Sequence, residues 1–185
     1  MNAKRLAPLM LAVAFALGGC ASSGASGLLA ADAPRALPGS GPVSVAWTDP
    51  AEFSELKYSG NRFESARGEW LTTLAEYLRD RTQAQLPAGE RLELTIVDVQ
   101  RAGRYEPWRM NMQDVRVVRD VYPPRMTLRF RHFDASGALV SEGERKLSDP
   151  GFLTHLTPLS DNDSLRHEKR LVDTWLRREF RTAAN

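Results

Sequence analysis

Apolar and polar side chains alternate in four stretches of the chain, the pattern typical of half-buried β-strands. The first is "VSVAW" at Val43–Trp47, and the second is "RLELTIVDV", in which Leu92, Leu94 and Ile96 share one face. The other two, "RMTLRFRHF" and "ALVSEGERKL", flank "DASG" at Asp134–Gly137, whose aspartate and glycine predict a hairpin turn. A weaker strand is predicted over "DVRVVRDV".

Helical spacing of apolar residues occurs twice. The first helix is predicted over residues 62–86, with Asn61 placed to cap its start. The second lies near the C-terminus and has Asp163 or Ser164 as its cap. Its apolar stripe consists of Leu165, Leu171, Val172, Trp175, Leu176 and Phe180. The order of elements predicts an α+β fold, a mostly antiparallel sheet of four to five strands with two main helices packed on one face.

The N-terminus has the features of an export signal. Lys4 and Arg5 precede an apolar run that is too short to span a bilayer and ends in "LGGC". This ending resembles the lipobox of bacterial lipoproteins, so we expect residues 1–19 to be a lipoprotein signal peptide and Cys20 to carry the lipid. The residue after Cys20 is Ala21 and not the aspartate that favours inner-membrane retention. This points to the outer membrane, facing the periplasm. The alternative is ordinary cleavage near "ASSGASG", which would remove Cys20.

Composition divides the rest of the chain into two parts. Residues 20–42 are rich in small residues and predict a flexible tether, with a reach of roughly 25 Å, and residues 43–182 predict a single globular domain. Removing the signal peptide takes Lys4 and Arg5 from the 25 cationic residues, which leaves 23 against 23 acidic ones. A neutral mature protein argues against a nucleic-acid partner. Cys20 is the only cysteine, so the fold has no internal disulfide.

Familiar catalytic and metal-binding spacings are missing from the sequence. It contains no G-x-S-x-G, no G-x-x-x-x-G-K-[ST] and no H-E-x-x-H. His132, His155 and His167 are far apart in sequence, and we expect His132 and His167 on solvated surfaces. The sequence therefore predicts no cofactor and no metal site.

One tryptophan has no evident place in the core. Trp47, Trp70 and Trp175 each fall on an apolar stripe, whereas Trp108 lies in "RYEPWRMNM", which has no clean period. An aromatic side chain beside an arginine in an irregular segment can anchor a partner or stack on a ligand. It can equally fold back over the sheet as a lid.

Charged residues near Trp108 complete a candidate binding surface. Arg119 and Asp120 come at the end of the weaker predicted strand, where side chains are well placed to meet a partner. We predict that Trp108, Arg109, Arg119 and Asp120 contribute to one exposed surface. The alternative is that Arg119 and Asp120 form a local ion pair and that Trp108 belongs to the core.

Five stretches are specific enough to compare with known families. They are "WTDPAEF", "LPAGERLELTIVDVQRAGRYEPW", "DVRVVRDVYPPRM", "EGERKLSDPGFL" and "LRHEKRLVDTWLRREF". They resemble an uncharacterised Gram-negative lipoprotein family, domain of unknown function 3016, over nearly all of Val43–Phe180. The resemblance implies a small exported domain, often with a lipoprotein signal, and implies no activity and no catalytic residues.

The leading hypothesis is a lipid-anchored periplasmic domain that is more a binding module than an enzyme, held to the membrane at Cys20 and partnered by an envelope protein. One alternative is a periplasmic enzyme acting on cell-wall or small substrates, with Glu106, Asp114 or Asp120 as acid–base groups near the two arginines. The other is a small-ligand binder that uses Trp108 and the same arginines. A polar pocket with an isolated buried carboxylate favours the enzyme, and an exposed aromatic patch favours the partner surface.

Overall fold

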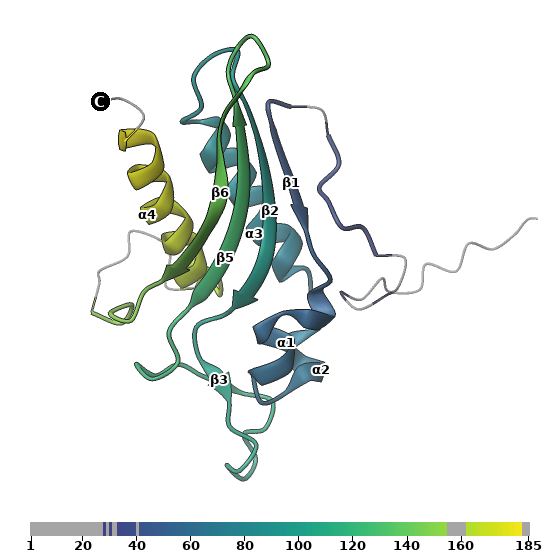
Figure 1. Ribbon diagram of the computed structural model, residues 1–185. Helices are drawn as coiled ribbons and strands as arrows, with labels where there is room; N and C mark the ends of the chain where they lie inside the picture. The colour runs from purple at the N-terminus through teal and green to yellow at the C-terminus, as the bar shows by residue number, and fades with distance from the viewer. Residues whose placement is uncertain (1–27, 29, 31–32, 40, 155–161, 183–185) are drawn as a thin grey trace, which may run out of the picture.

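A four-stranded sheet with the order β1-β2-β5-β6 forms the centre of the fold (Figure 1). The computed structural model describes residues 28, 30, 33–39, 41–154 and 162–182. β1 (Val43–Trp47) pairs in parallel with β2 (Arg91–Gln100). β5 (Arg125–Phe133) is antiparallel to both β2 and β6 (Leu139–Ser148). The sheet is therefore mixed, with one parallel and two antiparallel pairs.

Two long helices cover one face of this sheet, which confirms the predicted α+β class. α3 (Trp70–Gln83) packs on β1, and α4 (Arg166–Thr182) packs on β5, β6 and α3 (Figure 1). Alternate strand residues point toward the helices because successive side chains of a strand face opposite sides. The buried strand residues in this core include Val43, Val45, Trp47, Leu92, Leu94, Ile96, Leu128 and Phe130.

The helix predicted over residues 62–86 is two helices. Asn61 caps the first as predicted, because its side-chain oxygen accepts a hydrogen bond from the Glu64 amide at 3.1 Å. That helix, α2 (Arg62–Ser65), ends after a single turn, and Gly68 then adopts a positive φ of 71° before α3 begins. The Trp70 indole donates to the carbonyl of Ser65, the last α2 residue, at 2.9 Å. This buried hydrogen bond joins α3 to α2 across the break.

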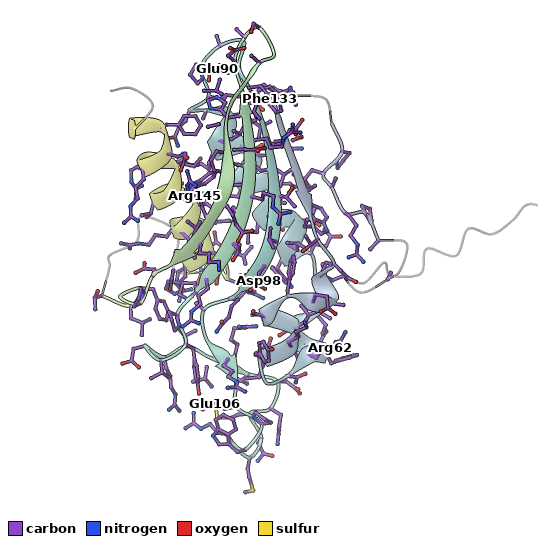
Figure 2. The ribbon with its side chains drawn as sticks, in the orientation of Figure 1. Arg62, Glu90, Asp98, Glu106, Phe133 and Arg145 are labelled. Atoms are coloured by element: carbon purple, nitrogen blue, oxygen red, sulfur yellow. The ribbon has the colours of Figure 1, made fainter. Side chains whose placement is uncertain are left out.

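A bulge in β2 positions a short helix. The pairing with β5 shifts between Ile96 and Asp98, so Val99 also points into the core. The Asp98 carboxylate accepts hydrogen bonds from the Ser54 amide at 2.6 Å and the Ser54 hydroxyl at 2.7 Å. β2 thereby caps α1 (Ser54–Tyr58), which follows the 3-10 turn η1 (Pro50–Glu52) (Figure 2).

The weaker strand predicted over "DVRVVRDV" is much shorter than predicted and lies outside the main sheet. Only β4 (Arg116–Val117) is extended, and it pairs with β3 (Arg104–Tyr105) in a separate two-stranded sheet. The close approach depends on Gly103, which has a φ of 81° and whose added Cβ would lie 2.7 Å from the Val117 carbonyl oxygen. This turn carries the chain away from the main sheet.

The hairpin prediction is confirmed. Gly137 has a φ of 85°, and its amide donates to the Asp134 carbonyl at 3.0 Å. The Asp134 carboxylate also accepts the amides of Ser136 and Ala138, which fixes the turn between β5 and β6.

Part of the segment assigned to the tether pairs with the sheet. Ala36 forms an antiparallel bridge with Ala46, and the Leu37 amide donates to the Val45 carbonyl at 2.9 Å. Residues 35–37 therefore cover the outer edge of β1. Cys20 lies outside the described residues, and within the described part of the chain no helix has the length and hydropathy needed to cross a membrane.

Candidate functional site

Residues 105–122 form a lobe at the end of the sheet opposite the β5–β6 hairpin turn (Figure 1). Two backbone hydrogen bonds tie its base together. The Gly103 amide donates to the Tyr122 carbonyl at 3.0 Å, and the Tyr105 amide donates to the Ser59 carbonyl at 2.7 Å. The second bond requires Gly60, whose φ is 92° and whose added Cβ would lie 2.1 Å from the Tyr105 carbonyl oxygen. These hydrogen bonds hold the base of the lobe against the rest of the fold.

Glu106 is the centre of the lobe. This residue is 1% exposed, and its carboxylate accepts hydrogen bonds from Arg119 Nη2 at 3.0 Å and from the Tyr122 hydroxyl at 3.3 Å. Arg109 Nη1 lies 3.7 Å from Glu106 Oε2, the oxygen that also accepts the hydrogen bond from Arg119. Figure 2 labels Glu106 within the lobe. A buried carboxylate therefore holds two arginines next to each other, with about half of each side chain in solvent.

The structure decides between the two interpretations of Trp108. Its side chain is 63% exposed, so the lid and core alternatives are wrong. Arg119 pairs with Glu106 instead of Asp120, whose carboxylate accepts the Val121 amide at 2.9 Å. The alternative of a local ion pair between Arg119 and Asp120 is therefore wrong. The buried acceptor was not anticipated because Glu106 lies 13 residues from Arg119 in the sequence.

Further apolar side chains of the lobe are exposed beside these residues. Met110 is 85% exposed and is the most exposed large apolar residue in the described chain. Val115 and Val121 are also exposed. We call the set Trp108, Arg109, Met110, Arg119, Asp120 and Val121 the lobe surface. Exposed apolar groups concentrated in one segment, with arginines among them, are typical of recognition surfaces.

The three carboxylates proposed as acid–base groups have separate bonding partners. Glu106 is bonded by arginines and a tyrosine, as described above. Asp114 accepts a hydrogen bond from the Asn61 side chain at 3.2 Å, and Asp120 binds a backbone amide of its own turn. Each carboxylate therefore has a local structural role.

A buried ion pair attaches the lobe to the body. Glu55 of α1 accepts hydrogen bonds from the Ser65 hydroxyl at 2.8 Å and the Arg101 amide at 2.9 Å, and it also binds the Arg116 guanidinium of β4. Arg116 donates in addition to the Gly103 carbonyl at 3.1 Å. Three elements, α1, α2 and β4, and the residue that follows β2 meet at this carboxylate. The only sequence signal was a glutamate placed between the apolar residues of "FSELKY".

The first turn of α4 buries two titratable residues. Glu168 is almost fully buried, its carboxylate accepts the Ala102 amide at 2.6 Å, and burial raises its pKa above the usual value. A signal was present in the sequence, because Glu168 falls three positions after Leu165 and four before Val172 on the apolar stripe.

His167 is not on a solvated surface, so that expectation is wrong. The residue is 7% exposed, and its ring meets the Phe152 ring edge-on with 4.8 Å between centroids. Burial is the largest cause that lowers its pKa, and the positive charges of Arg166 and Arg170 act in the same direction. The imidazole is therefore neutral at physiological pH.

A cavity of about 580 Å³ lies between α4 and strands β5 and β6. Its walls include Leu92, Phe130 and Trp175, and His132 at its wall has Nε2 2.6 Å from the Glu90 carboxylate. The His132 side chain is only 16% exposed, so its expected solvated position is also wrong. The volume falls in the range of small-molecule sites, and mostly apolar walls suit an apolar ligand.

No group of three or more potential metal-ligating side chains comes together within the described residues.

Comparison with known proteins identifies the family. Searches of curated proteins and of solved structures give no match. A family model described as "Protein of unknown function (DUF3016)" matches residues 41–178, which cover both sheets and most of α4. The chain therefore belongs to the DUF3016 family.

Proposed function

We propose that this protein is a non-enzymatic binding module of the Gram-negative cell envelope. It would be anchored to the membrane through lipid at Cys20, face the periplasm from the outer membrane, and bind another envelope protein through the lobe surface. The observation that carries this proposal is the 63% exposure of Trp108 in the lobe where one buried carboxylate holds Arg109 and Arg119.

The chemistry of the lobe surface supports a protein partner. Tryptophan and arginine contribute most to binding energy at protein interfaces, where the aromatic ring fills a pocket and the guanidinium donates several hydrogen bonds. Glu106 restrains Arg119 before any partner arrives, so less side-chain entropy is lost on binding. Preorganised arginines beside an exposed indole are suited to a surface that presents an apolar pocket and acidic groups.

Affinity capture with the intact lipoprotein tests the proposal. Wild type, Trp108→Ala and Arg109→Ala are each used to capture partners from envelope extracts, and retained proteins are identified by mass spectrometry. Both substitutions should reduce retention of the wild-type partner by at least about tenfold, the effect of losing an interface residue worth 1.4 kcal/mol or more. Thermal unfolding should change little, because exposed side chains contribute little to stability.

A matched control lies at the opposite end of the molecule. Leu139, in β6 next to the hairpin turn, is a large apolar side chain that is also exposed. Leu139→Ser should retain the partner as the wild type does. The lobe surface would be scaffold if Trp108→Ala and Arg109→Ala both captured normally, or if both unfolded the domain.

A further inference from the structure

A hollow of about 260 Å³ lies where the first turn of α4 meets the base of the lobe. Its walls carry three guanidinium groups, from Arg101, Arg116 and Arg166, together with His167. Val118 supplies an apolar wall. Because α4 has its N-terminus here, the helix dipole adds further positive potential.

Arg101 has no ion pair among the described residues, although it is partly buried. Its Nη2 donates to the Ser164 carbonyl at 3.3 Å, and its guanidinium lies 5.5 Å from the centroid of the Trp70 ring. Within the described structure, its buried Nε has no hydrogen-bond partner. Burial, followed by the positive charge of Arg116, lowers the pKa of Arg101. A buried cation without a carboxylate is costly, so this position favours an anion.

The neighbouring carboxylates do not fill that role. Glu55 is bonded to Arg116, Ser65 and a backbone amide. Glu168 binds the Ala102 amide through one oxygen, and burial favours its protonated form. Arg101 and Arg116 therefore share one carboxylate, Glu55, which is bonded to Arg116, so Arg101 is left without an anionic partner among the described residues.

His167 provides a second, independent indication. The residue is more than nine-tenths buried and lines the hollow, and neither of its ring nitrogens has a hydrogen-bond partner in the described part of the structure. Buried polar atoms in proteins are nearly always bonded, and a bound ion is one of the partners that such an unbonded group accepts. A neutral imidazole can donate one hydrogen bond to an oxyanion.

We propose that this hollow binds a small oxyanion, a carboxylate or phosphate group, with Arg101 as its principal cation. Arg116 and Arg166 add positive potential, His167 adds a donor, and Val118 contacts the apolar part of the ligand. The site is separate from the lobe surface, so neither proposal depends on the other. A small metabolite that carries one such group matches the size of the hollow.

Thermal unfolding with added anions tests the site. Sodium phosphate and sodium acetate are each titrated against sodium chloride at equal ionic strength. Binding should raise the Tm of the wild type with the logarithm of the anion concentration above Kd, by about 3 °C at roughly ten times Kd, and chloride should not. A rise with phosphate alone identifies a phosphate site, a rise with acetate alone identifies a carboxylate site, and either supports the proposal.

Two variants and a control complete the test. Arg101→Gln should keep or raise the Tm without anion, because an unpaired cation is removed, and should abolish the anion-dependent rise. Val118→Phe should also abolish the rise by filling the hollow while all the cations remain. Arg177→Gln, on the exposed side of α4, should respond as the wild type does. An equal rise with chloride, no rise at all, or an unchanged rise in both hollow variants would overturn the proposal.

Discussion

At the scale of single residues, buried carboxylates determine how the lobe is attached. Glu55 is fully bonded to Ser65, Arg101 and Arg116, whereas Glu168 has one buried oxygen without a partner among the described residues. A bonded carboxylate stabilises the junction, and an incompletely bonded one costs free energy when it is ionised. The two residues should therefore respond differently to neutral substitutions.

Glu168 should make stability depend on pH. Its pKa in the fold is raised above 4.5, so the folded state holds the proton more tightly than the unfolded chain. The contribution of Glu168 to the free energy of unfolding should therefore fall as pH rises from about 4.5 toward the raised pKa. Glu168→Gln keeps an acceptor for the Ala102 amide and removes this titration, so its stability relative to wild type should increase with pH.

Denaturant unfolding from pH 4.5 to pH 8 checks this difference. Glu142→Gln, on the exposed side of β6, is the control and should follow the wild type at every pH. Parallel curves for wild type and Glu168→Gln would show that the carboxyl titrates normally in the fold.

Gly60 supplies a second prediction at this scale. In Gly60→Ala the new Cβ would meet the Tyr105 carbonyl oxygen at 2.1 Å, and the φ of 92° is strained for any L-residue with a side chain. We expect a loss of at least about 2 kcal/mol in the free energy of unfolding. Gly68→Ala is the matched control, because Gly68 also has a positive φ but has no atom within 4 Å of the added Cβ. Equal losses for the two variants would mean that strain alone, and not the contact with Tyr105, matters.

At the scale of elements, local patterns predicted what repeats within one stretch of chain. The strands of the main sheet, the hairpin turn and the stripe of α4 follow from alternation, turn residues and helical spacing. The break between α2 and α3 was missed because Phe63 continues the helical spacing although it is exposed. The pairing of β4 with β3 was also missed, because two-residue strands are too short to show an alternating pattern.

The phase of α4 is the element-scale prediction. Trp175 is 3% exposed and packs within the core, so Trp175→Ala should lower the free energy of unfolding by about 3–5 kcal/mol. Arg177→Ala, on the exposed side of the same helix, should cost less than about 0.5 kcal/mol. Thermal or denaturant unfolding of both variants measures the difference. Equal losses would contradict the packing of α4 described here.

At the scale of the whole molecule, sequence patterns predicted the fold class and left the site only partly determined. Trp108 and Arg109 were identified because their segment has no clean period, and Arg119 and Asp120 because they come at the end of a predicted strand. All four residues are exposed in the structure. Glu106, which fixes the two arginines, and the hollow around Arg101 were not identified as such. Both depend on burial and on contacts across the fold, which periodicity does not encode.

Anchoring is the prediction that concerns the whole chain. If Cys20 is lipidated, the domain is held near the membrane by the part of the tether that precedes the pairing of residues 35–37 with β1, and the lobe surface is available to a partner in the periplasm. Cys20→Ser should leave the precursor uncleaved at this site and without lipid, while Ser22→Ala should be processed like the wild type. Mass spectrometry of the mature N-terminus, together with membrane fractionation, measures both properties. An unmodified wild-type protein that begins after Gly24 and is soluble in the periplasm would show that export does not end in a lipid anchor, and the proposed function would then require another means of holding the domain at the envelope.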